Sequence, residues 1–233
     1  METNSPERLS TVDASHLFFD YSSTSCRLVA LSPSKTASIQ SVARLRDRIP
    51  KEGERRKRMA VPDSDNLNAI ALHFSFGEFA AVLGSDLEET DSANKKTGWS
   101  AVFDSGMIEK LSLRPANLFK VAHHGSENGH HSKIWTELLA KTPLSIATPF
   151  SCHRLPKESD IERITPLSSS FIVTRNPIPK SKVKRERLVE KWIKSQTLQR
   201  SVVNERIGHI QIRVSTSGIN NIGLCNNCVE FST

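Results

Sequence analysis

The chain has 233 residues, a formal net charge of +7 and an isoelectric point of about 9.4. It contains no run of about 18 apolar residues and no N-terminal signal pattern, which excludes a transmembrane helix and predicts a cytoplasmic protein without a membrane partner. Its length favours a single domain. The four cysteines, at positions 26, 152, 225 and 228, are too few for a disulfide-dense scaffold.

Short apolar runs alternate with segments of helical spacing along most of the chain. Residues 1–24 are polar and weakly patterned. In the first half of the chain, the pattern predicts a strand at 26–31, a helix at 36–49, a charged loop at 50–68, a hairpin of strands at 69–75 and 79–84, and a loop at 85–98. Next it predicts a helix at 99–111, a strand at 118–122, a helix at 133–140 and a strand at 144–148. The last predicted elements are a helix at 158–164, a strand at 171–174, an amphipathic helix at 183–199 and a strand at 207–215. This alternation predicts an α/β fold with a layered sheet.

Two adjacent histidines directly follow the predicted strand at 118–122. They are His123 and His124, in the segment KVAHHGS that spans residues 120–126. Strand ends are where layered α/β folds place their chemistry, and neutral imidazole is the commonest metal ligand. Gly125 lets the backbone turn sharply after the histidines. A histidine taken alone is more often a polar surface residue than a ligand, so the segment becomes informative only together with its neighbours.

An aspartate follows another predicted strand in the same way. The segment VLGSDLE at residues 82–88 ends an apolar run in a turn of small residues and then Asp86. A carboxylate beside a histidine can bridge two metal ions, which clamp a phosphoryl group and generate hydroxide near neutral pH. A lone aspartate after a strand is more often a turn former or a helix cap.

The order of these segments along the chain matches that of a known family. The chain carries, in order, Leu-Ser-Pro at 31–33, an Asn at 66 or 68, Gly-Ser-Asp at 84–86, the KVAHHGS segment, IATPF at 146–150 with Leu-Pro at 155–156, and Gly-His-Ile-Gln-Ile at 208–212. In this order it resembles the metallo-β-lactamase fold hydrolases, in particular the branch related to the hydrolase domain of the DNA-uptake protein ComEC. The resemblance covers roughly residues 26–175 and 207–218.

The resemblance implies roles for individual residues. Asp86 corresponds to the metal-bridging carboxylate and His124 to the last metal ligand, with His123 a second candidate because the histidine is doubled. His153 lies where the family often has a histidine facing the cleft, and we expect it either to orient substrate or to be a plain loop residue. Ser85 departs from the glycine or alanine of the family. The implied cofactor is zinc, with two divalent ions in the complete enzyme.

The family's first half is missing from this chain. That half carries His-x-His-x-Asp-His, which supplies most of the metal ligands, and no such motif occurs here. Catalytic zinc usually has three protein ligands, so we expect the chain alone to bind metal weakly or not at all and to be inactive. His130 and His131 are further candidate ligands, although a polar loop is the commoner role for such a pair. The complementary half is expected upstream or on a second chain.

The resemblance also defines the expected architecture. Residues 25–233 are expected to form the C-terminal half of an αββα sandwich, with one mixed sheet, helices on its outer face and a basic helical insertion at about 176–206. The inner face of this sheet should be apolar. It should need a covering sheet, because monomeric proteins rarely expose large apolar patches.

The remaining features leave several functions open. Basic clusters at 51–58 and 180–187 can neutralise phosphates, although a solvated loop or helix face is commoner. Cys225-x-x-Cys228 predicts free thiols first, and half of an intermolecular zinc site second. Our favoured interpretation is one part of a hydrolase of DNA or RNA phosphodiesters. The alternatives are a degenerate, non-catalytic module of the same fold that binds nucleic acid or a protein partner, and a nucleic-acid-binding domain of another fold.

Overall fold

The structure is a computed structural model that describes residues 12–49, 66–89, 96–150, 153–177, 185–197 and 207–232. The basic cluster at 51–58, the lysines at 180, 182 and 184, and Cys152 lie outside these ranges. Within the described part of the chain, no helix has the length and apolar character needed to cross a bilayer.

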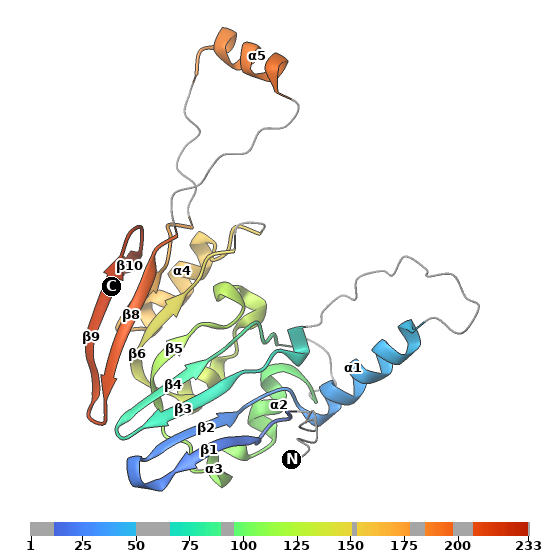
Figure 1. Ribbon diagram of the computed structural model, residues 1–233, viewed down its shortest axis with the longest axis vertical. Helices are drawn as coiled ribbons and strands as arrows, with labels where there is room; N and C mark the ends of the chain where they lie inside the picture. Colours follow the sequence, from blue (N-terminus) through green and yellow to red (C-terminus); the bar gives the residue numbers. More distant parts are fainter. Residues whose placement is uncertain are drawn as a thin grey trace, which may run out of the picture.

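One mixed sheet of eight strands forms the centre of the molecule (Figure 1). Its strands, in spatial order, are β1 (Leu17–Tyr21), β2 (Cys26–Ala30), β3 (Leu72–Phe76), β4 (Phe79–Leu83), β5 (Ala116–Lys120), β6 (Leu139–Ala147), β7 (Ser170–Val173) and β10 (Val229–Phe231). Neighbouring strands from β4 to β7 run parallel, and the outer pairs are antiparallel. The expected α/β class is therefore confirmed, as is the hairpin of β3 and β4.

Short helices cover one face of this sheet. They are α2 (Gly98–Asp104), α3 (Met107–Lys110), α4 (Glu158–Ile164) and a π-helical turn, η5 (Ile134–Leu138). Trp99 and Ile164 from these helices are fully buried in one cluster with Phe119 of β5. Shorter 3-10 turns connect the elements at η1 (Ser22–Thr24), η2 (Asn66–Asn68), η3 (Ala122–Gly125), η4 (Glu127–Gly129) and η6 (Thr165–Leu167). The core therefore lies mainly between the sheet and this helical layer.

A two-stranded hairpin packs on the opposite face. It consists of β8 (His209–Ser215) and β9 (Gly218–Cys225), which pair antiparallel. Ile210, Ile212 and Ile219 of the hairpin pack against Leu118 and Leu144 of the central sheet. The apolar residues of β5 and β6 are thus covered on both faces of the sheet. The strand predicted at 207–215 is confirmed, whereas β9 and β10 were not predicted.

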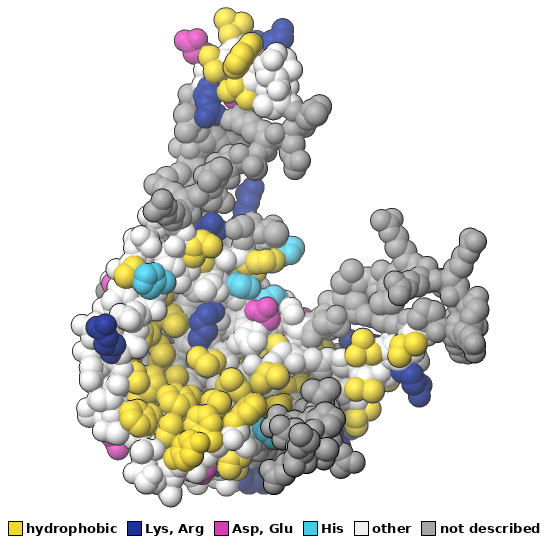
Figure 2. All heavy atoms as spheres, viewed as in Figure 1, with side chains coloured by type: hydrophobic (Ala, Val, Ile, Leu, Met, Phe, Trp, Pro, Cys, Tyr) yellow, Lys and Arg dark blue, Asp and Glu magenta, His cyan; other side chains and the backbone are white. Residues whose placement is uncertain are grey.

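The outer part of this inner face, over β1 to β3, has no complete covering layer among the described residues. The strand register places Phe19, Leu28 and Phe74 on the same face as Ala81. Tyr21, next to them, is 60% exposed. Figure 2 shows hydrophobic side chains gathered on this part of the surface. The inner face is thus apolar as expected, and β8–β9 covers only the side of β4 to β7.

Two helices expose an apolar stripe. Helix α1 (Lys35–Arg48) begins after Ser34, whose hydroxyl accepts a hydrogen bond from the Ala37 amide. It leaves Ile39, at 60%, and other apolar residues exposed. Helix α5 (Arg187–Gln196) leaves Leu188 78% exposed. The helices predicted at 36–49 and 183–199 are confirmed, the second over a shorter range.

The structure differs from the sequence-based expectation at one helix and adds a strand near the N-terminus. The helix predicted at 133–140 is only the turn η5, and strand β6 already begins at Leu139. Thr142 has a φ of 51° and Pro143 has no N–H to donate, so this stretch cannot continue a helix. The polar segment at 1–24 contains a strand, β1, because Leu17–Tyr21 finds hydrogen-bond partners along β2.

Candidate functional site

The candidate site lies at the carboxyl ends of β4 and β5, which are neighbouring parallel strands. Asp86 follows β4 and His124 follows β5, and the His124 Nε2 atom lies 3.5 Å from the Asp86 Oδ1 atom. The two loops are joined by the His123 amide, which donates to the Ser85 carbonyl at 2.9 Å. The ends of β4 and β5 therefore bring the side chains of Asp86 and His124 together.

Contacts on the side of the ring away from Asp86 fix the orientation of His124. Its Nδ1 atom lies 2.8 Å from the main-chain carbonyl oxygen of Thr148, and its ring stacks on Phe150 with centroids 5.0 Å apart. A carbonyl oxygen only accepts hydrogen bonds, so the neutral ring carries its proton on Nδ1. The Nε2 lone pair then points toward Asp86. Metal-binding histidines are commonly oriented by such a bond on the other nitrogen.

The second histidine of the pair belongs to a different cluster. The His123 Nδ1 atom is 3.1 Å from Glu88 Oε1, although it is buried without a well-directed hydrogen bond. The same carboxylate oxygen accepts from Asn66 Nδ2 at 2.8 Å. His123 and His124 both have a positive φ, of 44° and 55°, so their side chains diverge. The structure therefore places His124, and not His123, against Asp86.

Glycines allow the two strand ends to approach this closely. A Cβ atom on Gly84 would lie 2.7 Å from the Ala122 amide nitrogen and 2.8 Å from its Cα. Gly125 has a φ of 85°, which matches the sharp turn expected after the histidines. Its carbonyl oxygen accepts a hydrogen bond from Arg163 Nη2 at 2.7 Å, which ties this turn to α4.

A lysine also contributes to the electrostatics around Asp86. Lys120 is the last residue of β5, and its side chain is half-buried. Burial lowers the pKa of Lys120, and the negative charge of Asp86 raises it in opposition. Asp86 therefore faces a cationic group of the chain itself. The carboxylate of Asp86 is 52% exposed, so the site is accessible from solvent.

The third residue predicted for the site, His153, lies further out. It is exposed, and its ring centroid is 5.4 Å from that of Phe150, which in turn stacks on His124. His153 thus lies one aromatic ring away from the pair of Asp86 and His124. Among the described residues, no three His, Cys, Asp or Glu side chains come together closely enough to hold a metal ion.

The remaining candidate ligands have other contacts. Trp135 Nε1 donates to His130 Nδ1 at 3.2 Å, and His131 stacks on Phe103 with centroids 4.8 Å apart. Cys225 and Cys228 are free thiols, as predicted, and the Cys228 thiol lies 3.4 Å from the Cys225 carbonyl oxygen. These residues therefore take part in local packing and in turns.

One buried and one half-buried histidine predict how stability depends on pH. Burial lowers the pKa of His73, which is 1% exposed, and lowers the pKa of His130 to about 4, with Arg163 and His131 adding to the second shift. The unfolded chain therefore binds more protons than the folded chain below pH 6.5. The free energy of unfolding should be highest above about pH 6.5 and fall as the pH decreases toward 5, by at most about 1.4 kcal/mol per pH unit for each histidine.

Urea denaturation between pH 7.5 and 5 measures this slope. His130→Gln keeps an acceptor for the Trp135 indole but cannot titrate, so the slope should be smaller in this variant. A slope that is unchanged in His130→Gln, or a stability that rises toward pH 5, would contradict the assignment.

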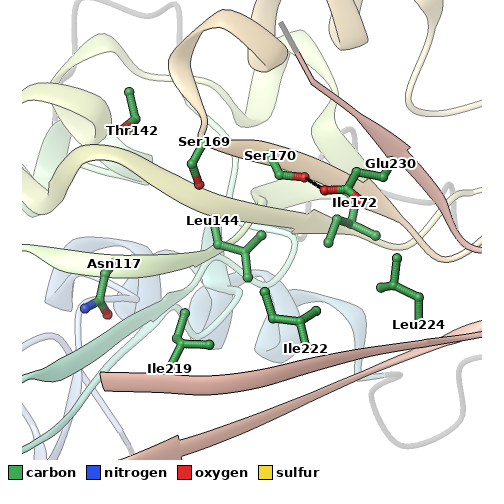
Figure 3. Close-up of a pocket in the computed structure, with 10 residues that line it drawn as sticks. All are labelled: Asn117, Thr142, Leu144, Ser169, Ser170, Ile172, Ile219, Ile222, Leu224 and Glu230. Atoms are coloured by element: carbon green, nitrogen blue, oxygen red, sulfur yellow. Dashed lines mark hydrogen bonds between the residues drawn. The ribbon is translucent and has the colours of Figure 1, made fainter. Parts of the chain in front are cut away.

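A cavity lies at the opposite end of the parallel strands from Asp86. Its volume is about 460 Å³, and it opens between β5–β7 and the hairpin strand β9. Figure 3 shows Leu144 and Ile172 of the sheet facing Ile219 and Ile222 of β9. The cavity is mainly apolar and takes no part in the candidate site. Sequence analysis did not predict it, because β9 was not predicted.

Two contacts of the site were also missed from the sequence. The Thr148 carbonyl that orients His124 is a main-chain group, for which the sequence has no signal. Glu88, which lies beside His123, follows Asp86 by two residues. An acidic residue at this place after a strand end could have been recognised as a candidate site residue.

No family model, no curated protein and no solved structure matches this chain. The functional interpretation therefore rests on the motif residues and on their geometry.

Proposed function

We propose that this chain is the C-terminal half of a metal-dependent hydrolase of the metallo-β-lactamase type, acting on phosphodiesters of DNA or RNA. The observation that carries the proposal is the approach of His124 Nε2 to Asp86 Oδ1, 3.5 Å, at the ends of two parallel strands. Carboxyl ends of parallel strands are the usual position of ligand sites in α/β folds. The site residues expected from the motif order are thus neighbours in space.

The donor atoms fit part of a zinc site. His124 offers Nε2 with its other nitrogen bonded to a carbonyl, and Asp86 offers a carboxylate that is 52% exposed. A bound zinc ion would supply a hydroxide near neutral pH. In this proposal Asp86 and His124 hold the metal, and His153 orients the substrate from beyond Phe150. Further ligands come from the complementary half, since catalytic zinc usually has three protein ligands.

The open half of the inner sheet face supports the idea of a complementary half. Phe19, Leu28 and Phe74 lie on this face beside the hairpin β8–β9, which already covers the neighbouring strands. Among the described strands, β8 pairs with β9 on one side only. A partner strand can therefore extend the small sheet across β1 to β3 and bury these side chains. We propose that the segment carrying the remaining ligands binds here.

The charge of the chain supports a polyanionic substrate. The net charge is +7, and the basic residues include a cluster at 51–58. Positive charge of this kind increases the rate and strength of association with nucleic acids. A β-lactam substrate would not require it.

A second candidate function is a non-catalytic module of the same fold that binds nucleic acid or a protein. The observation that favours it is Lys120, whose charge interacts with Asp86 and partly compensates the carboxylate without a metal ion. This candidate predicts salt-sensitive nucleic-acid binding that survives both Asp86→Ala and chelators.

The two candidates are separated by a reconstitution assay. The chain is expressed alone and together with an adjacent or in-frame upstream segment that carries His-x-His-x-Asp-His, and hydrolysis of a nitrophenyl phosphodiester and of DNA is measured with zinc or manganese. We expect activity only from the combined protein. His124→Ala should reduce it by more than about 100-fold, because even loss of a residue that merely supports a metal ligand costs about 10- to 100-fold.

The matched control is His123→Ala, which removes the same side chain from the neighbouring position. It should retain activity within about tenfold, because His123 contacts Glu88 and not Asp86. Hydrolysis by the isolated chain, lost on His124→Ala, would show that the chain is a complete enzyme. Chelator-resistant DNA binding without hydrolysis would establish the non-catalytic module.

A further inference from the structure

We propose that helix α5 (Arg187–Gln196) attaches the chain to an anionic lipid surface, lying in the plane of the membrane with its apolar face in the headgroup layer. This proposal concerns an interaction surface and does not depend on the function of the site around Asp86. The sequence predicts no membrane partner because it has no spanning segment, and the lack of such a segment does not bear on attachment to a membrane surface.

The apolar residues of α5 share one side of the helix. Leu188 and Trp192 are one turn apart, as are Val189 and Ile193, and the two pairs are adjacent on the helix surface. Leu188, Val189 and Trp192 are 78%, 45% and 66% exposed. An apolar stripe of this size on a short helix is stable only when something covers it, and no described residue of the chain does.

The basic residues of α5 lie on the opposite side. At 100° per residue, Arg187, Lys191 and Lys194 fall within one arc that faces away from Leu188 and Trp192. The sequence from 180 to 194 has seven Lys or Arg against two Glu. Cations on the polar side of a helix that lies on a membrane meet the negative headgroups, so the charge of this segment is complementary to an anionic leaflet.

The combination of both faces favours lipid over nucleic acid. A nucleic acid would satisfy Arg187, Lys191 and Lys194 but would leave Leu188 and Trp192 in water. A bilayer interface accepts both groups at once, and tryptophan is enriched there because its ring is apolar and its N–H is polar. The helix has ten residues, about 15 Å in length, which is too short to span a bilayer of about 30 Å.

Helix α1 (Lys35–Arg48) provides an internal comparison. It also exposes Ile39 and Val42, at 60% and 61%. Arg46 lies two turns after Ile39 and therefore falls within the same stripe. Apolar and basic residues are thus not separated on α1, and the pair Ile39 and Val42 makes a matched control for nonspecific apolar adhesion.

The test is co-sedimentation of the full chain with vesicles of phosphatidylcholine, with and without phosphatidylserine. We expect binding to the vesicles that contain phosphatidylserine, weakened by salt. The double change of Leu188→Ser and Trp192→Ser should reduce binding by about tenfold or more, and Lys191→Glu with Lys194→Glu by a similar factor. Because all four side chains are exposed, unchanged thermal melting verifies that these variants remain folded.

The α1 control, Ile39→Ser with Val42→Ser, should bind vesicles within about twofold of the unmodified chain. The proposal is overturned if the chain does not sediment with anionic vesicles, or if the α1 and α5 variants lose binding equally. It is also overturned if the α5 variants lose affinity only for an oligonucleotide, which would assign the helix to nucleic acid.

Discussion

Weak zinc binding by the chain is expected to fall below detection on His124→Ala and to remain within about threefold on His123→Ala. The two histidines are adjacent in sequence but differ in their surroundings. His124 presents Nε2 to Asp86 at 3.5 Å, whereas His123 is enclosed by Glu88 and Asn66. Only the first can share an ion with Asp86 without rearrangement of the backbone.

Titration of the chain with zinc or cobalt at millimolar concentration measures this difference, since an incomplete site binds weakly. Asp86→Asn should resemble His124→Ala, because the amide retains the shape but loses the charge of the carboxylate. Proton–nitrogen correlation spectra of the histidine rings provide a second measurement, in which metal-free His124 should carry its proton on Nδ1. Equal losses in the two histidine variants would refute the assignment of His124.

The second large effect is expected at Gly84. Gly84→Ala should lower the free energy of unfolding by about 2–3 kcal/mol and weaken zinc binding with it. The added Cβ would lie 2.7–2.8 Å from the amide nitrogen, Cα and Cβ of Ala122, which is fully buried. Relief of this overlap requires β4 and β5 to move apart at their carboxyl ends. That movement separates Asp86 from His124.

Gly223→Ala is the matched control for this change. A Cβ on Gly223 would meet its nearest atoms, on Gln211, at 3.8 Å, which is ordinary contact. Urea denaturation should therefore show a change of no more than about 0.5 kcal/mol for Gly223→Ala. If Gly84→Ala were as stable as Gly223→Ala, the close packing of the two strand ends would not be a property of the folded chain.

The position of the site could be predicted from the sequence because it depends on local patterns. The apolar runs before Asp86 and His123 identified β4 and β5, and a polar residue after such a run lies at the strand end. The two runs are also consecutive strands joined by a helical segment, which favours parallel neighbours. The meeting of Asp86 and His124 then follows from the topology.

The choice between His123 and His124 could not be predicted. It depends on the left-handed backbone of both residues and on main-chain carbonyls such as that of Thr148. Neither feature can be inferred from the residue types. Strands β9 and β10 were missed for another reason. β9 has the sequence GINNIGLC, in which Asn220, Asn221 and Gly223 interrupt the apolar pattern, and its strand conformation depends on pairing with β8.

The central claim is that Asp86 and His124 are two ligands of one metal ion. The most direct measurement is anomalous diffraction at the zinc edge from crystals of the chain grown with excess zinc. The account predicts a peak at about 2.0–2.2 Å from both His124 Nε2 and an Asp86 carboxylate oxygen. Zinc bound only elsewhere, for example between Cys225 and Cys228, with none beside His124, would contradict it.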